Sequence, residues 1–130
     1  MNEPLRQVGA VTLFVEDVRR SRSFYEETFD VPVIYEDDDS VVFRFENMLV
    51  NVLQETAARE LIDPAPVGPR ESGARFQFTI WVDDANAASA RLSARGVTLL
   101  NGPVDREWGM RTAAFADPDG HVWEIAQRLE

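Results

Sequence analysis

The chain has 130 residues, no cysteine and a formal net charge of −10 at pH 7, and 45% of its residues are hydrophobic. This length and apolar content predict one domain spanning residues 1–130. The lack of cysteine excludes disulfides, thiolate nucleophiles and cysteine metal sites, and the acidic balance argues against nucleic acid as a partner. All 13 basic residues are arginine, which excludes lysine Schiff-base chemistry.

Signals for membranes and secretion are missing from the sequence. No apolar run approaches the roughly 20 residues that span a bilayer. The first four residues, Met1-Asn2-Glu3-Pro4, lack the basic and apolar regions of a signal peptide. We therefore expect no membrane partner and a cytoplasmic protein.

The first part of the chain, residues 5–55, predicts a module of one helix and four strands in the order β-α-β-β-β. Alternation over residues 9–15 indicates a strand, and Asp17 is suited to cap a helix that runs to about Phe29. The acidic run 36–39 indicates a solvated hairpin tip. The remaining strands are predicted at residues 31–35, 41–45 and 48–54.

Residues 56–74 contain three prolines and two glycines and predict a linker, with a short helical turn at 57–61. A second module follows at 75–130. Its helix is expected at 84–95, ended by Gly96. Its strands are expected at 76–82, 97–100, 110–116 and 122–127, with a loop at 101–109.

A weak internal repeat relates the two modules. Residues 12–17, Thr-Leu-Phe-Val-Glu-Asp, recur 67 positions later as Thr-Ile-Trp-Val-Asp-Asp at 79–84. This period is longer than that of a solenoid repeat and favours two paired modules. We therefore expect the site where the two modules meet.

The strands have one apolar and one mixed face, because successive side chains point to opposite sides of a sheet. The apolar faces are expected to pack under the helices, and they comprise Val11, Leu13, Val15, Val50 and Val52 in one module and Phe76, Phe78, Ile80, Val82, Trp123 and Ile125 in the other. The mixed faces are typical of a pocket lining. They comprise Ala10, Thr12, Phe14, Leu49, Asn51 and Leu53, and in the second module Gln77, Thr79, Trp81, Val122, Glu124 and Ala126. The alternation in 110–116 is ambiguous and leaves the face of Arg111 open.

Two motifs resemble the vicinal oxygen chelate superfamily, which includes glyoxalase I, bleomycin-resistance proteins, fosfomycin-resistance enzymes and extradiol dioxygenases. They are Leu13-Phe14-Val15-Glu16-Asp17, followed by Ser23-Phe24-Tyr25, and the closing run Asp117-Pro118-Asp119-Gly120-His121-Val122-Trp123-Glu124. The resemblance covers nearly the whole chain. It implies an α+β fold of two paired β-α-β-β-β modules that form a cupped mixed sheet with helices on the outer face. It also implies a homodimer.

The resemblance implies a site at four strand positions, which in this sequence are Ala10, Asn51, Gln77 and Glu124. Enzymes of the superfamily hold a divalent metal there with His, Gln and Glu. Only Glu124 is a charged ligand in this chain, whereas zinc and non-haem iron need several strong donors. We therefore expect no metal cofactor, with a divalent ion as the alternative. His121, the only histidine, is expected at the turn and not as a ligand.

Each candidate residue has a structural alternative. Glu124 either pairs with an arginine such as Arg111 or acts as a recognition group or general base. Trp81 and Phe14, at equivalent repeat positions, either pack on the sheet or stack on a ligand. Trp108, in a predicted loop, is a further candidate. The predicted ligand-binding set is Phe14, Asn51, Gln77, Thr79, Trp81, Trp108, Arg111 and Glu124, with Glu124 as the catalytic candidate.

The sequence therefore predicts a small-molecule-binding protein of the glyoxalase or bleomycin-resistance type that acts without a metal. Resemblance to the bleomycin-resistance proteins implies sequestration of a cationic, partly planar compound. The first alternative is a metal-dependent lyase or isomerase of the glyoxalase type, with Glu124 as ligand or base. A second alternative is a structural or regulatory module with a vestigial cup, against which the polar and aromatic residues of the mixed face argue.

Overall fold

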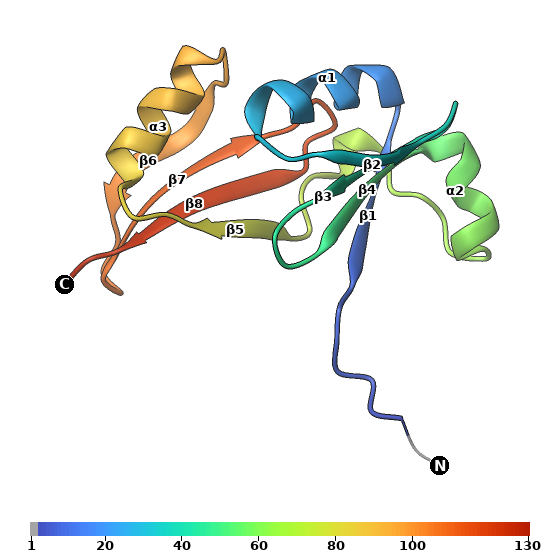
Figure 1. Ribbon diagram of the computed structural model, residues 1–130, viewed down its shortest axis with the longest axis horizontal. Coiled ribbons are helices and arrows are strands. Elements are labelled where there is room, and N and C mark those ends of the chain that lie inside the picture. Colours follow the sequence, from blue (N-terminus) through green and yellow to red (C-terminus); the bar gives the residue numbers. More distant parts are fainter. Residues whose placement is uncertain (1–2) are drawn as a thin grey trace. The chain divides into compact units, whose positions relative to one another are not determined.

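The computed structural model describes residues 3–130 and divides the chain into two units, Met1–Val67 and Gly68–Glu130 (Figure 1). Met1 and Asn2, part of the segment examined for a signal peptide, lie outside the described residues. No helix within residues 3–130 combines the length and the apolar character needed to cross a membrane. The two units are described separately below.

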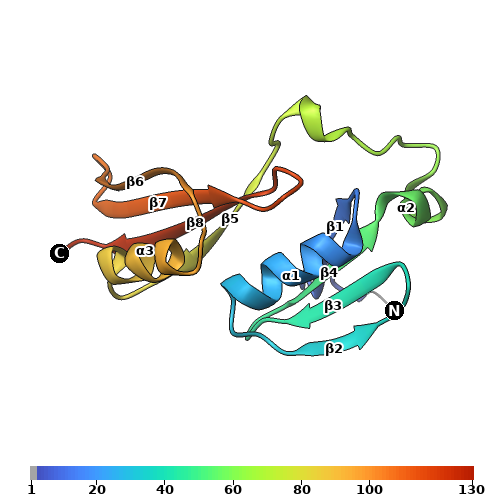
Figure 2. The ribbon, with the colours of Figure 1, turned by 90° about the horizontal axis from the view of Figure 1, so that it is seen from above.

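The first unit has the predicted β-α-β-β-β order. Its elements are β1 (Ala10–Val15), α1 (Val18–Thr28), β2 (Val33–Glu36), β3 (Ser40–Arg44) and β4 (Leu49–Gln54). The strands form one sheet in the order β1-β4-β3-β2, in which β1 runs parallel to β4 and the other pairs are antiparallel. The helix α1 packs against β4 and β3, beside which it lies in Figure 2.

The core of the first unit lies between α1 and the apolar face of this sheet. Leu13, Val15, Val50 and Val52 are buried, as the alternation predicts. Tyr25 of α1 is also fully buried, and its ring lies 5.7 Å from that of Phe43 on β3. Burial of these apolar surfaces is the main stabilising contribution in a unit of this kind.

The second unit repeats the order with β5 (Gln77–Trp81), α3 (Ala85–Ala94), β6 (Leu99–Asp105), β7 (Met110–Ala116) and β8 (Val122–Arg128). Its sheet has the order β5-β8-β7-β6, with β5 parallel to β8. The helix α3 packs against β6, β7 and β8. Phe115, Trp123 and Ile125 are buried on the helix side. The α+β class and the two four-stranded mixed sheets are thus as predicted.

Three local expectations were wrong. The length of one helix was underestimated: the helical turn predicted at 57–61 is confirmed, but it belongs to a helix of eight residues, α2 (Glu55–Ile62), and a short 3-10 turn follows at Arg70–Ser72. The strand predicted at 97–100 continues to Asp105, through most of the predicted loop, and its pairing with β7 is irregular on both sides of Asn101. Phe76, predicted to pack under the helix, is 50% exposed and lies just before β5.

Both large helices begin in the same way. The Asp17 carboxylate accepts hydrogen bonds from the backbone N–H groups of Arg19 and Arg20, and the Asp84 carboxylate accepts one from Ala87, so the two predicted N-caps are confirmed. A glutamine at the end of each parallel neighbour strand adds a second contact. The side-chain oxygen of Gln54 accepts from Val18 N at 3.0 Å, and that of Gln127 from Ala85 N at 2.9 Å. These glutamines join each helix start to the final strand of its sheet.

Candidate functional site

Four of the candidate site residues of the second unit, Gln77, Thr79, Trp81 and Glu124, share the sheet face opposite α3. Residues on this face pair as Gln77 with Val122, Thr79 with Glu124 and Trp81 with Ala126. Their neighbours along the strands, Phe78, Trp123 and Ile125, occupy the other face, and the latter two are buried in the core. We call the surface formed by Gln77, Thr79, Trp81, Thr112, Ala114, Glu124 and Ala126 the open face of the second sheet.

Glu124 is the carboxylate of this open face. The Thr79 hydroxyl donates a hydrogen bond of 2.9 Å to Glu124 Oε1. Within residues 3–130 the other oxygen, Oε2, takes no hydrogen bond and no ion pair. A carboxylate accepts several hydrogen bonds, so Glu124 is held in place by one neighbour and keeps acceptor capacity for another molecule.

Trp81 shares this face with Glu124, and two alanines lie opposite them in the strand pairing. Trp81 is 68% exposed, two residues along β5 from Thr79. Ala114 and Ala126, both small, lie opposite Glu124 and Trp81 in the strand pairing. Trp108 is 71% exposed in the turn between β6 and β7. Trp81 thus offers an exposed aromatic ring on which a flat molecule can stack, whereas Ala114 and Ala126 are buried.

Arg106 is a cationic residue near this face that the sequence reasoning missed. Its Nε donates to the Thr112 hydroxyl at 3.0 Å, and a terminal nitrogen donates to the Asn101 side-chain oxygen at 3.2 Å. Because Thr112 pairs with Ala126, this network reaches the open face. The sequence gives no signal for Arg106, because it lies in a segment predicted to be a loop. Its contact with the open face follows only from the strand register.

Arg111 lies on the opposite face of the second sheet from Glu124. It pairs with Gln127 on β8 and with Asp105 on β6, and so lies on the side of Ile125 and not of Glu124. Its guanidinium donates two hydrogen bonds to Asp105, at 2.6 and 3.2 Å. These contacts lower the pKa of Asp105 and raise that of Arg111. The suggested pairing of Glu124 with Arg111 is therefore not formed.

The first unit carries a related pair at the equivalent positions. Asn51 pairs with Thr12 in the register of β4 and β1, and its amide nitrogen lies 3.4 Å from the Thr12 hydroxyl. The side-chain oxygen of Asn51 is buried and has no hydrogen-bond partner among the described residues. Phe14 lies on the same face, half-buried and opposite Leu53. Thr12 and Thr79 are 67 residues apart in the repeat, so each sheet has a threonine beside a polar residue of its final strand.

His121 belongs to the turn before β8. Its Nδ1 lies 2.7 Å from Asp117 Oδ2, and its backbone N–H donates to Oδ1 of the same carboxylate at 2.8 Å. Asp119 N–H donates to that oxygen as well, at 3.0 Å. Asp117 is 5% exposed. The carboxylate therefore organises the Asp-Pro-Asp-Gly turn, and His121 is held to it.

The donors on these faces do not fit a zinc or non-haem iron site. Within residues 3–130 no three His, Cys, Asp or Glu side chains are grouped to hold a metal ion. Ala10 offers no donor, and Gln77 and Asn51 are neutral amides. Zinc sites use several His, Cys or carboxylate ligands, and iron oxygenases use two His with a carboxylate. Glu124 alone supplies a charged ligand.

The comparisons with known proteins agree with this architecture. Residues 7–125 match the family model of the Glyoxalase/Bleomycin resistance protein/Dioxygenase superfamily, and the chain belongs to this superfamily. The resemblance to the vicinal oxygen chelate superfamily is thus confirmed.

Two sequence relatives span most of the chain. YraH of Bacillus subtilis, an uncharacterized protein, is 28% identical over 123 residues, which cover 92% of this chain and 96% of YraH. The metallothiol transferase FosB of Bacillus licheniformis is 25% identical over 126 residues, covering 95% of this chain and 77% of FosB.

Solved structures share the fold. A glyoxalase/bleomycin resistance protein/dioxygenase from Nocardioides has a TM-score of 0.87 at 21% identity, covering 100% of this chain and 87% of its own. The lactoylglutathione lyase of Agrobacterium tumefaciens has a TM-score of 0.75 at 17% identity, covering 96% of each chain. At these identities the likeness concerns the fold alone.

Proposed function

We propose that this protein binds a small, partly planar cation on the open face of the second sheet, without needing a metal. The observation that supports the proposal most is Glu124, whose Oε1 accepts from Thr79 while Oε2 has no partner within residues 3–130. An ionised acceptor of this kind favours a ligand that carries a cationic N–H group or a fixed positive charge.

The exposed tryptophan adds the preference for a flat ligand. Trp81 is 68% exposed and shares the face of Glu124. A cation over an indole ring gains roughly 0.5–2 kcal/mol, depending on desolvation. Gln77, at the other end of β5 from Trp81 and on the same face, supplies an amide that can both donate and accept. Phe14, Asn51 and Trp108 stay predicted ligand contacts, whereas Arg111 lies on the other face of the sheet and binds Asp105.

The second candidate is an enzyme of the lyase, isomerase or transferase type, in which Glu124 acts as general base or holds a divalent metal. The specific observation in its favour is the same free oxygen, on the final strand, where the superfamily resemblance places the carboxylate ligand. The name of one sequence relative, the metallothiol transferase FosB, supports this class. Turnover separates it from a binding protein.

Calorimetric titration with 1-methylquinolinium and with quinoline tests the role of charge. The two probes have nearly the same shape, but only the first is cationic at pH 7.5. We expect 1-methylquinolinium to bind more tightly, and Glu124→Gln to weaken it about tenfold, the loss of one charged contact. Glu60→Gln, which removes an equal charge from exposed α2, serves as the control. If Glu124→Gln binds 1-methylquinolinium as tightly as the original protein does, Glu124 is not part of the binding site.

Metal content decides between the two candidates. Protein purified without chelator or affinity-tag metal is analysed for bound ions and then titrated with nickel, zinc, manganese and iron(II). A binding protein is expected to hold no stoichiometric ion and to show no thermal shift. About one tightly held ion per chain, lost in Glu124→Gln, would establish the metal-dependent alternative. The homodimer and the cytoplasmic location stay predictions.

A further inference from the structure

The first unit has a cavity of about 190 Å³ between the start of α1 and the β2–β3 hairpin. Val18 and Val41, both buried among the core residues, form its apolar wall. The other lining residues are charged: Arg19 and Arg22 from α1, and Glu36, Asp37 and Asp38 from the hairpin.

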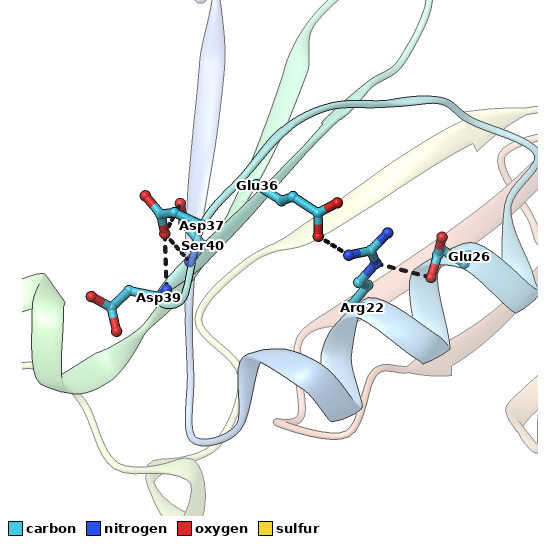
Figure 3. Close-up of polar contacts among 6 residues, drawn as sticks. All are labelled: Arg22, Glu26, Glu36, Asp37, Asp39 and Ser40. Atoms are coloured by element: carbon cyan, nitrogen blue, oxygen red, sulfur yellow. Dashed lines mark hydrogen bonds and ion pairs between the residues drawn. The ribbon is translucent and has the colours of Figure 1, made fainter.

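Two of these charges are satisfied inside the protein by one another. Arg22 Nε donates to Glu26 at 3.1 Å, and a terminal nitrogen of Arg22 forms an ion pair with Glu36. Figure 3 shows Arg22 reaching from α1 between these two carboxylates. This contact ties the helix to the end of β2 and closes one side of the cavity.

Asp37 is satisfied within the hairpin. Its Oδ1 accepts from the backbone N–H groups of Asp39 and Ser40, at 2.8 and 2.9 Å, and Oδ2 accepts from the Tyr35 hydroxyl at 2.8 Å. The backbone contact from Asp39 is the main cause of the lowered pKa of Asp37, which keeps the group ionised. Asp37 therefore shapes the hairpin tip and has little capacity left for a ligand.

One cation and one anion of the cavity have no such partner. Within residues 3–130, neither the Arg19 guanidinium nor the Asp38 carboxylate takes part in a hydrogen bond or an ion pair. They come from different walls of the cavity, Arg19 from the helix and Asp38 from the hairpin. The cavity thus offers one unpaired group of each sign beside an apolar wall.

The size of the cavity limits the ligand. Pockets for drug-sized molecules measure roughly 300–1,000 Å³, and a water takes about 30 Å³ in the liquid. A cavity of about 190 Å³ therefore suits a molecule of a few non-hydrogen atoms. A metal ion would use neither the guanidinium nor the valines, and a simple anion would leave Asp38 unpaired.

We propose that this cavity binds a small zwitterion of the α-amino-acid class, whose carboxylate pairs with Arg19 and whose ammonium group pairs with Asp38. Guanidinium and carboxylate groups match in a planar, two-bonded geometry. The side chain of the amino acid then faces Val18 and Val41. The site is separate from Glu124 and does not depend on the function proposed for the open face.

Three probes of similar size test this proposal on the full chain: L-alanine, propionate and ethylammonium. The last two each carry one of the charges of L-alanine. Binding is followed by amide chemical shifts in NMR spectra. We expect L-alanine to shift amides of α1 and of the β2–β3 hairpin, and to bind about five- to tenfold more tightly than either half-charged probe.

Four variants assign the charges. Arg19→Gln and Asp38→Asn are each expected to weaken L-alanine binding about five- to tenfold. Arg20→Gln and Asp39→Asn remove the same charges one position along the chain, outside the lining, and should leave it unchanged. Glu124→Gln should also leave it unchanged, which separates this test from that of the open face. All five positions except Glu124 are exposed, so the fold is expected to persist.

Each other outcome overturns the proposal. If propionate binds as tightly as L-alanine, and Asp38→Asn leaves the affinity for L-alanine unchanged, the cavity is an anion site. If ethylammonium binds as tightly as L-alanine, and Arg19→Gln leaves the affinity for L-alanine unchanged, the cavity is a cation site. Shifts that persist in both Arg19→Gln and Asp38→Asn, or no shift at the cavity at all, would show that L-alanine is not its ligand.

Discussion

Replacement of Gly102 by alanine tests the close contact between β6 and β7. Gly102 has φ +85°, and a Cβ added there would lie 2.3 Å from the carbonyl oxygen of Thr112 and 2.7 Å from the Cα of Ala113. Both are backbone atoms of β7 and cannot turn away. Gly109, in the turn that joins the two strands, has nearly the same φ of +84°, but its added Cβ would meet nothing within 4 Å.

The two glycines separate the conformational from the steric cost. A left-handed conformation costs an alanine roughly 1–2 kcal/mol, so Gly109→Ala should lower the free energy of unfolding by about that amount. Gly102→Ala has this cost and the contact with β7 as well. Forced overpacking costs about 1–3 kcal/mol, so Gly102→Ala should be less stable than Gly109→Ala by about that much. The loss of backbone freedom in the unfolded chain is the same for both variants and cancels in their difference.

Urea unfolding followed by circular dichroism measures both variants under identical conditions. The midpoints are compared at a common slope, because a change of slope would mean a change in surface exposed on unfolding. Equal losses in Gly102→Ala and Gly109→Ala would refute the argument, since they would show that β6 moves away from β7 at no cost. The same movement would displace the Arg106–Thr112 contact on the open face.

Two further predictions concern a buried hydroxyl and a surface ion pair. The Ser89 hydroxyl is buried in α3 and has no hydrogen-bond partner in the part of the chain that the structure describes. Ser89→Ala should therefore raise the free energy of unfolding by about 0.5–1 kcal/mol in the same assay. A loss of stability would show that the hydroxyl has a partner in solution. The pKa of Asp105 is lowered from 3.8 by Arg111, so its charged form stabilises the fold above pH 3.8, and this contribution is lost as the pH falls through the lower, folded pKa. Asp105→Asn should therefore lower Tm at pH 7 and have little effect near pH 2; an equal loss at both pH values would contradict the assignment.

The pairing of the first and last strands within each unit explains why some site residues could be predicted. Thr79 and Glu124 were placed on one face by alternation alone, and they are hydrogen bonded at 2.9 Å. Asn51 was placed in the same way and lies opposite Thr12. When the first and last strands of a unit pair in parallel, the side chains of paired residues lie on the same face of the sheet, whatever the length of the chain between them.

Other residues of the site could not be found by pattern. In 110–116, Met-Arg-Thr-Ala-Ala-Phe-Ala, each of the two alternating sets contains both polar and apolar residues, so period two does not distinguish the faces of β7. The pairing with β8 decides them: Ala114 lies opposite Glu124, and Arg111 opposite Gln127. Arg106 reaches the open face because β6 runs on to Asp105, past the irregular pairing at Asn101. The pairing of β6 with β7 depends on contacts between two strands and cannot be read from the sequence of either one.

The sequence by itself determined the α+β class, the two modules, the superfamily, the helix starts at Asp17 and Asp84 and the separation of apolar and mixed faces on β1, β4, β5 and β8. Each follows from signals within a few residues: period-two alternation, an N-cap side chain or a repeated motif. Only the tertiary structure decided the partner of Glu124, the face of Arg111, the glutamine contacts at the helix starts and the cavity beside Arg19 and Asp38. Those features depend on strand register and on contacts between residues far apart in the chain, which local pattern does not encode.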